Sequence, residues 1–348
     1  MSNLNLNPRN ITNAIKDFCS INYQKLPTLS PEVLENGVKR TQFNIEIDGK
    51  SCVFIVYIKT NGKVSIQIQG QDTDWGNQIK QYVIGKCQIS DNYQYNISIP
   101  YTESFFYDFL EYLKKCGAVE KIKKNILTGV QYVFEAPFFD KITLHKYKNG
   151  NLFIQGKPLW LSQQINYYLS DKDCLSDLIK AHENTYHIEL NLSEVDTIFN
   201  SIFATVSTKI NSDIHKMLST SIAFTKLEIL NLPDYSAFTS PALRCLESFI
   251  QEIFLKNEIP YIKKEAIGEN FSLELDKYVL NPECIKGKVT KDNKIYLENI
   301  YNHYYKYRNR LFHTETPTNE TLFIETKDSA DKMIMDVCYL IKDGYTNL

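Results

Sequence analysis

In the first half of the chain, hydrophobic and polar residues alternate within short runs. Residues typical of turns separate these runs. The runs "SCVFIVYIK" and "KITLHKY" are rich in β-branched and aromatic residues, and Asn61-Gly62 and Asn149-Gly150 follow them closely. An Asn-Gly pair supplies the positive φ angles that a tight hairpin needs. The pattern therefore predicts two antiparallel meanders in this half of the chain.

The two meanders belong to a weak internal repeat. One copy reads "YIKTNGKVSIQIQGQDTDWGNQIKQY" and the other reads "HKYKNGNLFIQGKPLWLSQQINYY". In both copies the Gln of Gln-Ile follows the Gly of Gln-Gly by eight positions, over Gly70–Gln78 and Gly156–Gln164. The only two tryptophans, Trp75 and Trp160, lie within these intervals, where we expect them to be buried. We interpret the agreement as a duplication.

Amphipathic helices are expected on both sides of each meander. "NITNAIKDFCSI" and "TESFFYDFLEYLKKC" precede the two sheets, and residues 73–86 and 159–169 follow the Gln-Gly pairs. Helices on one face leave the opposite face of an antiparallel sheet exposed or open to a partner. This arrangement resembles the TATA-binding-protein-like fold. Because neither copy has a strongly basic stripe, a scaffolding role and a role in RNA or protein binding both stay open.

After about residue 188 apolar residues recur at spacings of three and four, which is typical of helices. A helix is expected in "SPALRCLESFIQEIFLKN", with Ser240 as its N-cap and Pro241 at its first position. A looser insert over residues 260–292 precedes a helix through "KIYLENIYNHYYKYRNRLF" and a last helix over 327–342. The predicted fold class is α+β: two tandem α/β repeats, 1–90 and 91–187, and an all-α domain, 188–348.

Composition restricts the class of protein. With 43% hydrophobic and 23% charged residues and no long uncharged apolar window, the chain resembles soluble globular proteins and has no expected membrane partner. Its polar N-terminus lacks the segments of a secretory signal, so we expect a cytoplasmic protein. The eight cysteines have no metal-ligand spacing, and we expect buried thiols, no metal site and no cofactor.

Charge is informative only locally, because the net charge is −2. Residues 277–310 contain eight basic and three acidic residues, which suits a phosphate backbone but also an ordinary solvated face. Arginine is scarce, and lysine provides the positive charge at almost all positions where charge alone is needed. An arginine that is kept is a candidate for bidentate binding of phosphate or carboxylate. The five arginines are Arg9, Arg40, Arg244, Arg308 and Arg310.

The run "YNHYYKYRNRLFHTETP" combines two of these arginines with many tyrosines. Arg308 and His313 would lie about 140° apart on an uninterrupted helix. Pro317 indicates that the helix ends near His313. A helix end at this place would allow the imidazole of His313 to face the same site as Arg308. A surface ion pair of Arg308 and a helix-terminal role of His313 are the alternatives. The tyrosines cover more than one side of the helix, as expected if it packs in its own domain and against a second chain.

"RNRLFH" fits the R-x(4 to 6)-H signature of HEPN-domain ribonucleases, including a polar residue, Asn309, after the arginine. Together with the duplicated half, the length and "SPALRCLESF", it makes the whole chain resemble the ribonuclease LS family, the RnlA/LsoA-type toxins of type II toxin–antitoxin systems. The resemblance implies an all-α HEPN domain, metal-independent cleavage of mRNA, a homodimer through the HEPN domains, and an antitoxin that binds the C-terminal domain. The family's assisting glutamate matches Glu247, and Arg244 shares its helix face.

The residue types suit RNA cleavage, since RNA carries its own nucleophile in the 2′-hydroxyl. Cleavage needs a base, an acid for the departing 5′-oxygen, and positive charge at the phosphate, and it leaves 2′,3′-cyclic phosphate and 5′-hydroxyl ends. His313 suits proton transfer and Arg308 suits the phosphate. Glu247 could orient His313, balance an arginine or accept a proton. Arg310 is assigned to RNA or dimer contacts, and Asn309 to supporting the site.

Two other functions compete with this one. In some HEPN toxins a partner modifies a tyrosine two residues after the histidine, but here that position is Glu315. The second alternative is a non-catalytic RNA-binding or scaffold protein, in which the duplicated half carries out the recognition.

Overall fold

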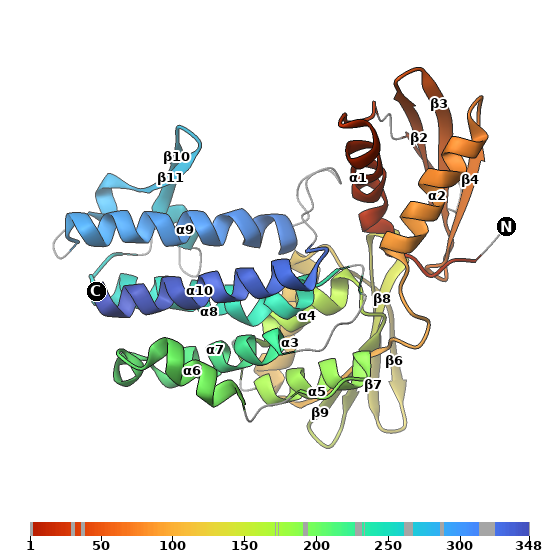
Figure 1. The fold of residues 1–348 in the computed structure, drawn as a ribbon. Helices are drawn as coiled ribbons and strands as arrows, with labels where there is room; N and C mark the ends of the chain where they lie inside the picture. Colours follow the sequence, from red (N-terminus) through yellow and green to blue (C-terminus); the bar gives the residue numbers. More distant parts are fainter. Residues whose placement is uncertain are drawn as a thin grey trace.

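The computed structural model describes residues 3–28, 32–35, 39–170, 172, 174–190, 194–226, 232, 234–260, 267–285, 289–312 and 324–347; of 32–35 and 309–312 it describes the backbone alone. Two sheets with their helices lie at one end of the molecule, and a set of nearly parallel helices forms the other end (Figure 1). The observed class is α+β, as predicted.

The first unit is a four-stranded antiparallel meander that two helices cover. Its strands pair in the order β1-β2-β3-β4, and Gly62, with φ 71°, lies in the predicted hairpin between β3 and β4. The side chains of Ile15, Phe54 and Ile79 are buried between the helices and the sheet. The elements are α1 (Ile11–Tyr23), β1 (Glu32–Glu35), β2 (Lys39–Ile47), β3 (Lys50–Ile58), β4 (Val64–Gln69) and α2 (Thr73–Cys87).

The second unit repeats the meander and adds a strand. Its sheet has the order β5-β9-β8-β7-β6, and Gly150, with φ 84°, lies in the second predicted hairpin. Helix α5, which the pattern did not indicate, packs against β5 and α7. The elements are β5 (Tyr95–Pro100), α3 (Glu103–Lys115), β6 (Val119–Ile126), β7 (Gly129–Ala136), β8 (Asp140–Tyr147), β9 (Asn151–Gly156), α4 (Trp160–Leu169) and α5 (Leu175–Tyr186).

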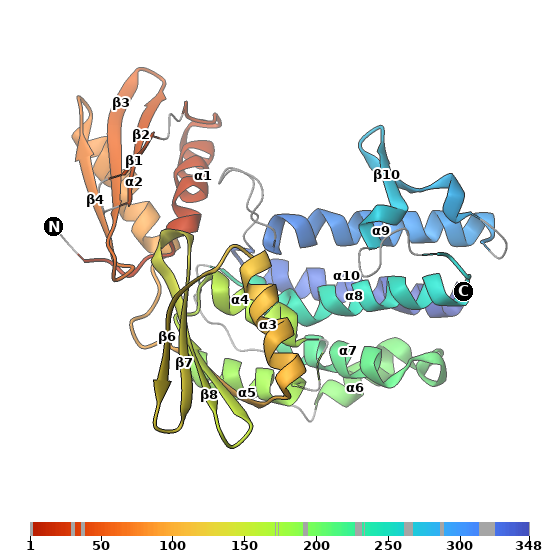
Figure 2. The same ribbon diagram turned by 180° about the vertical axis from the view of Figure 1, so that it is seen from behind.

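Helix α4 is the element on which the three parts of the molecule meet. Trp160 at its start is buried, as predicted, and the guanidinium of Arg9 lies 4.2 Å from the centre of the indole. Asp140 accepts a hydrogen bond of 2.7 Å from the amide of Leu161. Farther along the helix, the side chain of Tyr167 belongs to the core of the helical part. Figure 2 shows α3 and α4 between the second sheet and the C-terminal helices.

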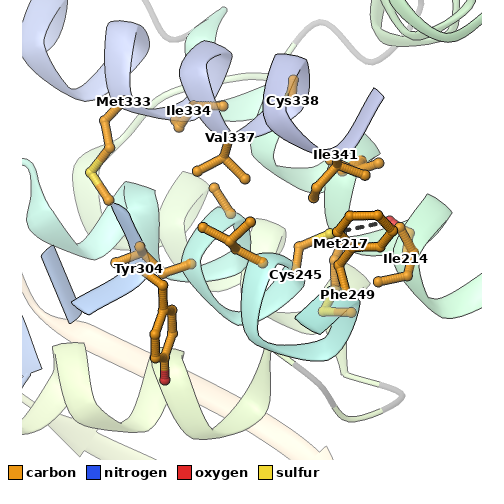
Figure 3. Close-up of a cluster of buried hydrophobic side chains, with 14 of the residues drawn as sticks. Ile214, Met217, Cys245, Phe249, Tyr304, Met333, Ile334, Val337, Cys338 and Ile341 are labelled. Carbon is orange, nitrogen blue, oxygen red and sulfur yellow. Dashed lines mark hydrogen bonds between the residues drawn. The ribbon is translucent and has the colours of Figure 1, made fainter. Parts of the chain in front are cut away.

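The C-terminal part is helical, as predicted, apart from one hairpin inside the insert of residues 260–292. Helix α8 packs against α4, α7, α9 and α10, and its Cys245 and Phe249 are fully buried (Figure 3). The elements are α6 (Val195–Phe203), α7 (Ser212–Thr225), α8 (Ser236–Lys256), β10 (Phe271–Glu274), β11 (Lys277–Leu280), α9 (Lys291–Phe312) and α10 (Lys327–Asn347).

The predicted start of α8 was wrong. The helix begins at Ser236, so Ser240 is not its N-cap and Pro241 lies inside the helix. The carboxylate of Asp234 accepts from the amide of Ser236, the first residue of the helix, at 2.9 Å and from its hydroxyl at 2.5 Å, so one of the unpaired amides at the helix start has a partner. The earlier start also buries Phe238 in the core, which favours the extra turn despite the missing amide hydrogen of the proline.

Other predictions from the sequence have mixed outcomes. All eight cysteines are free thiols, and seven of them are buried while Cys116 is half-buried. Among the helices of the described residues, none has the length and apolar character to cross a membrane. The resemblance to TATA-binding-protein-like and HEPN folds and the domain boundaries at 90 and 187 stay predictions.

Two helical glycines provide a test of the packing around α10. A Cβ atom on Gly344 would lie 2.5 Å from the hydroxyl of Tyr296 and 2.6 Å from the ring of Phe249, whereas one on Gly85 would meet nothing within 4 Å. Overpacking costs about 1–3 kcal/mol, whereas alanine gains up to about 1 kcal/mol over glycine in a helix. We therefore expect Gly344→Ala to lower Tm in thermal unfolding and Gly85→Ala to raise it. Equal shifts in the same direction would contradict this packing.

Candidate active site

A pocket of about 610 Å³ opens where α3 and α4 of the second unit meet α8 and α9. Three of the predicted site residues form part of its wall: Arg244 and Glu247 from α8 and Arg308 from α9. The second unit adds Tyr167, and it also places Lys115 and Lys172 at the pocket. The pocket is thus built by segments that are far apart in the sequence.

Glu247 is the buried acid of this pocket, with 8% of its surface exposed. It follows Arg244 by three positions on α8, so the two side chains leave the helix on the same side. Arg244 Nη1 donates to Glu247 Oε2 at 2.8 Å. The hydroxyl of Tyr167 donates to the same oxygen at 2.5 Å. The ion pair of Arg244 and Glu247 is therefore not an ordinary surface pair, because its carboxylate is buried.

Arg308 reaches the same cluster from α9. Its Nε lies 3.4 Å from the hydroxyl oxygen of Tyr167, to which it donates, and its guanidinium carbon lies 5.1 Å from the centre of that ring. Tyr304, one turn earlier on α9, places its hydroxyl 3.3 Å from that of Tyr167. Tyr304 thus packs in the core with its ring, as predicted, while its hydroxyl points away from Met333 and Val337 (Figure 3).

The electrostatics of the cluster favour charged side chains despite their burial. Burial by itself would raise the pKa of Glu247, but Arg244, Arg308 and hydrogen bonds from Tyr167 and Tyr304 together hold it below its usual range. Burial would likewise lower the pKa of Arg308, yet Tyr167, Tyr304 and Glu247 raise it. One carboxylate beside two guanidinium groups leaves an excess of positive charge, which suits a phosphate.

The structure brings together three of the six predicted site residues. His313 lies outside the described residues, one position beyond Phe312, where α9 is described to end. Asn309 and Arg310 lie on the last turn of α9, and only their backbone is described.

Sequence reasoning missed Tyr167 and the two lysines of the pocket. A signal for Tyr167 existed, because the repeat has Gln81 at the corresponding place in its first copy, three residues after the Gln of Gln-Ile. Lys115 and Lys172 carry no comparable signal in a chain that uses lysine for most of its positive charge. Their contribution depends on how α3 and the end of α4 face α8, which is a matter of tertiary structure.

Removing the charge of Glu247 tests how the buried cluster contributes to stability. Since the pKa of Glu247 is lowered by folding, its contribution is complete above the ordinary pKa of about 4.3 and is lost as the pH falls through the lowered value. We expect Glu247→Gln to reduce the free energy of unfolding at pH 7 by about 1–3 kcal/mol. Below about pH 4 the difference from the wild type should shrink.

Glu111→Gln is the matched control for this measurement by denaturant unfolding. Glu111 and Lys114 form another ion pair of 2.8 Å with the same spacing on α3, but the side chain of Glu111 is 63% exposed. An exposed pair of this kind contributes little to stability. If both variants changed stability equally at every pH, the role given to burial and to the two arginines would be wrong.

Comparison with known proteins agrees with the resemblance seen in the sequence. Family models described as "RNase LS, bacterial toxin N-terminal", "RNase LS, bacterial toxin" and "RNase LS, bacterial toxin DBD domain" match residues 1–83, 93–176 and 192–315. The mRNA endoribonuclease LsoA of Escherichia coli O157:H7 is 23% identical over 345 residues, which cover 94% of this chain and 97% of LsoA.

Two further similarities extend over most of the chain. The mRNA endoribonuclease toxin LS of Escherichia coli K12 is 21% identical over 347 residues, covering 97% of this chain and 94% of that protein. A crystal structure of the Escherichia coli toxin LsoA in complex with the T4 phage antitoxin Dmd is 22% identical, with a TM-score of 0.43, and covers 73% of this chain and 98% of that one. With three consecutive matches to models of one family, the chain belongs to the RNase LS family of bacterial toxins.

Proposed function

We propose that this chain is the toxin of a toxin–antitoxin system and acts as an mRNA endoribonuclease in the cytoplasm. The observation that carries the proposal is the buried cluster of Arg244, Glu247 and Arg308 on the wall of the pocket. Arg308 lies on α9, five positions before His313 in the sequence. Two relatives that share almost the whole length of the chain are named mRNA endoribonucleases, which supports the same class of reaction.

In the proposed reaction the 2′-oxygen of the RNA attacks the neighbouring phosphorus, and the bond from phosphorus to the 5′-oxygen breaks. His313 transfers a proton, either from the 2′-hydroxyl or to the departing 5′-oxygen. Arg308, with Arg244, stabilises the charge on the pentacovalent phosphate. Glu247 holds the two guanidinium groups in place. The products are a 2′,3′-cyclic phosphate and a 5′-hydroxyl end, and the reaction requires no metal ion.

The proposed enzyme is of the HEPN type and works as a homodimer. Two C-terminal domains would face each other so that each chain brings its own Arg308 and His313 to a shared site. The half-buried Tyr305 and Tyr307, at the end of α9 that leads to His313, provide apolar surface for such a contact. Arg310 is assigned to contacts with RNA or with the second chain, and Asn309 to supporting the site.

An antitoxin is the proposed protein partner. It would bind the C-terminal domain, residues 188–348, and keep the toxin inactive by covering the pocket or by preventing dimerisation. Family membership supports this partner, because the matched family consists of bacterial toxins.

Cleavage of a labelled mRNA in the presence of EDTA tests the reaction. We expect the wild type to cut the RNA and His313→Ala to lose about 10²–10⁴-fold of its rate, the usual contribution of a general acid or base. His215→Ala is the matched control, because His215 is exposed on α7 against Phe199, away from the pocket. The cleaved ends should accept phosphate from polynucleotide kinase without prior phosphatase treatment.

Two outcomes of this assay would contradict the proposal. A fully active His313→Ala protein would remove the proton-transfer role, and a need for added divalent metal would remove the metal-independent reaction. RNA binding without cleavage by the wild type would favour the non-catalytic alternative.

Arg308→Lys separates the shape of the arginine from its charge. Lysine keeps the positive charge but cannot form two parallel hydrogen bonds with phosphate, so we expect the cleavage rate to fall by about ten- to hundredfold. Circular dichroism and gel filtration should show a folded protein like the wild type. An unchanged rate would mean that Arg308 acts as a simple charge.

A further inference from the structure

We infer that Tyr167, on α4 of the second unit, is a positioning residue of the site and that its hydroxyl sets the arrangement of Glu247 and Arg308. The inference rests on the proposed function, and it makes the duplicated half of the chain a part of the active site. The tyrosine is neither an acid nor a base in this view, because it acts through the two charged side chains.

The hydroxyl of Tyr167 contacts two charged side chains of the cluster, one through its proton and one through its oxygen. A phenol has one hydrogen to donate and two lone pairs to accept. The hydrogen goes to Oε2 of Glu247 at 2.5 Å, and the oxygen accepts from Nε of Arg308 at 3.4 Å. The hydroxyl of Tyr304 lies 3.3 Å away. Because this single proton is committed to the carboxylate, the positions of the acid and the arginine depend on each other.

The ring of Tyr167 adds a second contact to both arginines. The guanidinium carbon of Arg308 lies 5.1 Å from the ring centre and that of Arg244 lies 5.8 Å from it. Cations favour the face of an aromatic ring at such distances. The side chain is 2% exposed, so α4, α8 and α9 fix it in place. One side chain therefore contacts all three predicted site residues that the structure describes.

The internal repeat shows that the fold of the unit does not require a tyrosine here. Ile79 and Ile165, which follow the Gln of each copy, are fully buried in their own units. Two residues later the first copy has Gln81, which is exposed on α2, whereas the second has Tyr167, which joins the core of the helical part. The burial of Tyr167 thus comes from its contact with the site helices and not from packing on its own sheet.

Tyr167→Phe removes the hydroxyl and keeps the ring, so it tests the hydrogen bonds alone. Without the hydroxyl, Glu247 loses a donor and Arg308 loses an acceptor, while the surface of the pocket stays the same. When catalytic side chains are held less precisely, the rate of the chemical step falls more than the affinity for the substrate. We expect kcat for RNA cleavage to fall about ten- to hundredfold, with KM changed by no more than about twofold.

Tyr95→Phe is the matched control, because it separates a positioning role from a structural one. Tyr95 is also 2% exposed, lies in the same unit, and donates one buried hydrogen bond of 2.8 Å, to Asn166. It does not line the pocket. Both variants should lose a similar amount of thermal stability, since each loses a buried hydroxyl, but only Tyr167→Phe should lose kcat.

The pKa of Glu247 gives a readout that a structural role would not move. A hydrogen bond to an ionised carboxylate lowers its pKa, so its removal raises the pKa of Glu247. In an NMR titration, the side-chain carboxyl carbon of Glu247 should therefore titrate at higher pH in Tyr167→Phe than in the wild type, and unchanged in Tyr95→Phe. Combining Tyr167→Phe with Glu247→Gln should give less than the sum of the two losses in log kcat, because both changes break one arrangement.

The outcomes distinguish this inference from the proposed function. If His313→Ala is inactive and Tyr167→Phe keeps the wild-type kcat and the wild-type pKa of Glu247, the inference is overturned and the proposed function stands. If the wild type does not cleave RNA, the proposed function is overturned and the inference with it. Should Tyr167→Phe fail to fold, Tyr304→Phe takes its place, with a smaller loss of kcat and a rise in the pKa of Glu247 expected. Unchanged values there would overturn the inference.

Discussion

The burial of the Glu247 carboxylate is the constraint on which the arrangement of the site depends. An ionised carboxylate removed from water is costly unless opposite charge and hydrogen-bond donors surround it. Helix α8 alone supplies only Arg244. The remaining partners come from α4 and α9, so these helices must approach α8 at this level for the charge to be stable.

Helix α8 can carry such a charge because its other sides are apolar. Cys245, Leu246, Phe249 and Ile250 on either side of Glu247 are buried in the core that α8 forms with its neighbours. On a helix that is buried on nearly all sides, a polar side chain cannot reach water. Its hydrogen-bond partners must therefore come from other elements. The core thereby determines where the polar cluster lies, and the cluster in turn determines how α4 contacts the helical part.

The sequence predicted the elements well and the site incompletely, for physical reasons. Helix and strand periodicity and the two Asn-Gly hairpins are local features, and so is the spacing that places Arg244 and Glu247 on one side of a helix. The start of α8 was missed because the hydrogen bonds between Asp234 and Ser236 and the burial of Phe238 outweigh the local signal of Pro241. Tyr167 was missed because its role depends on contacts with Glu247 and Arg308, which lie 80 and 141 positions farther along the sequence. His313 lies beyond the described end of α9, so its place relative to the cluster stays a prediction.

The contact of Arg9 with Trp160 links the beginning of the chain to the helix that carries Tyr167. Helix α4 has ten residues and is about 15 Å long, so the cation at one end and the buried tyrosine at the other are separated by less than three turns. The first unit is therefore not a detachable module. A shortened chain or a chimera that lacked Arg9 would lose the cation that lies 4.2 Å from the indole at the start of α4.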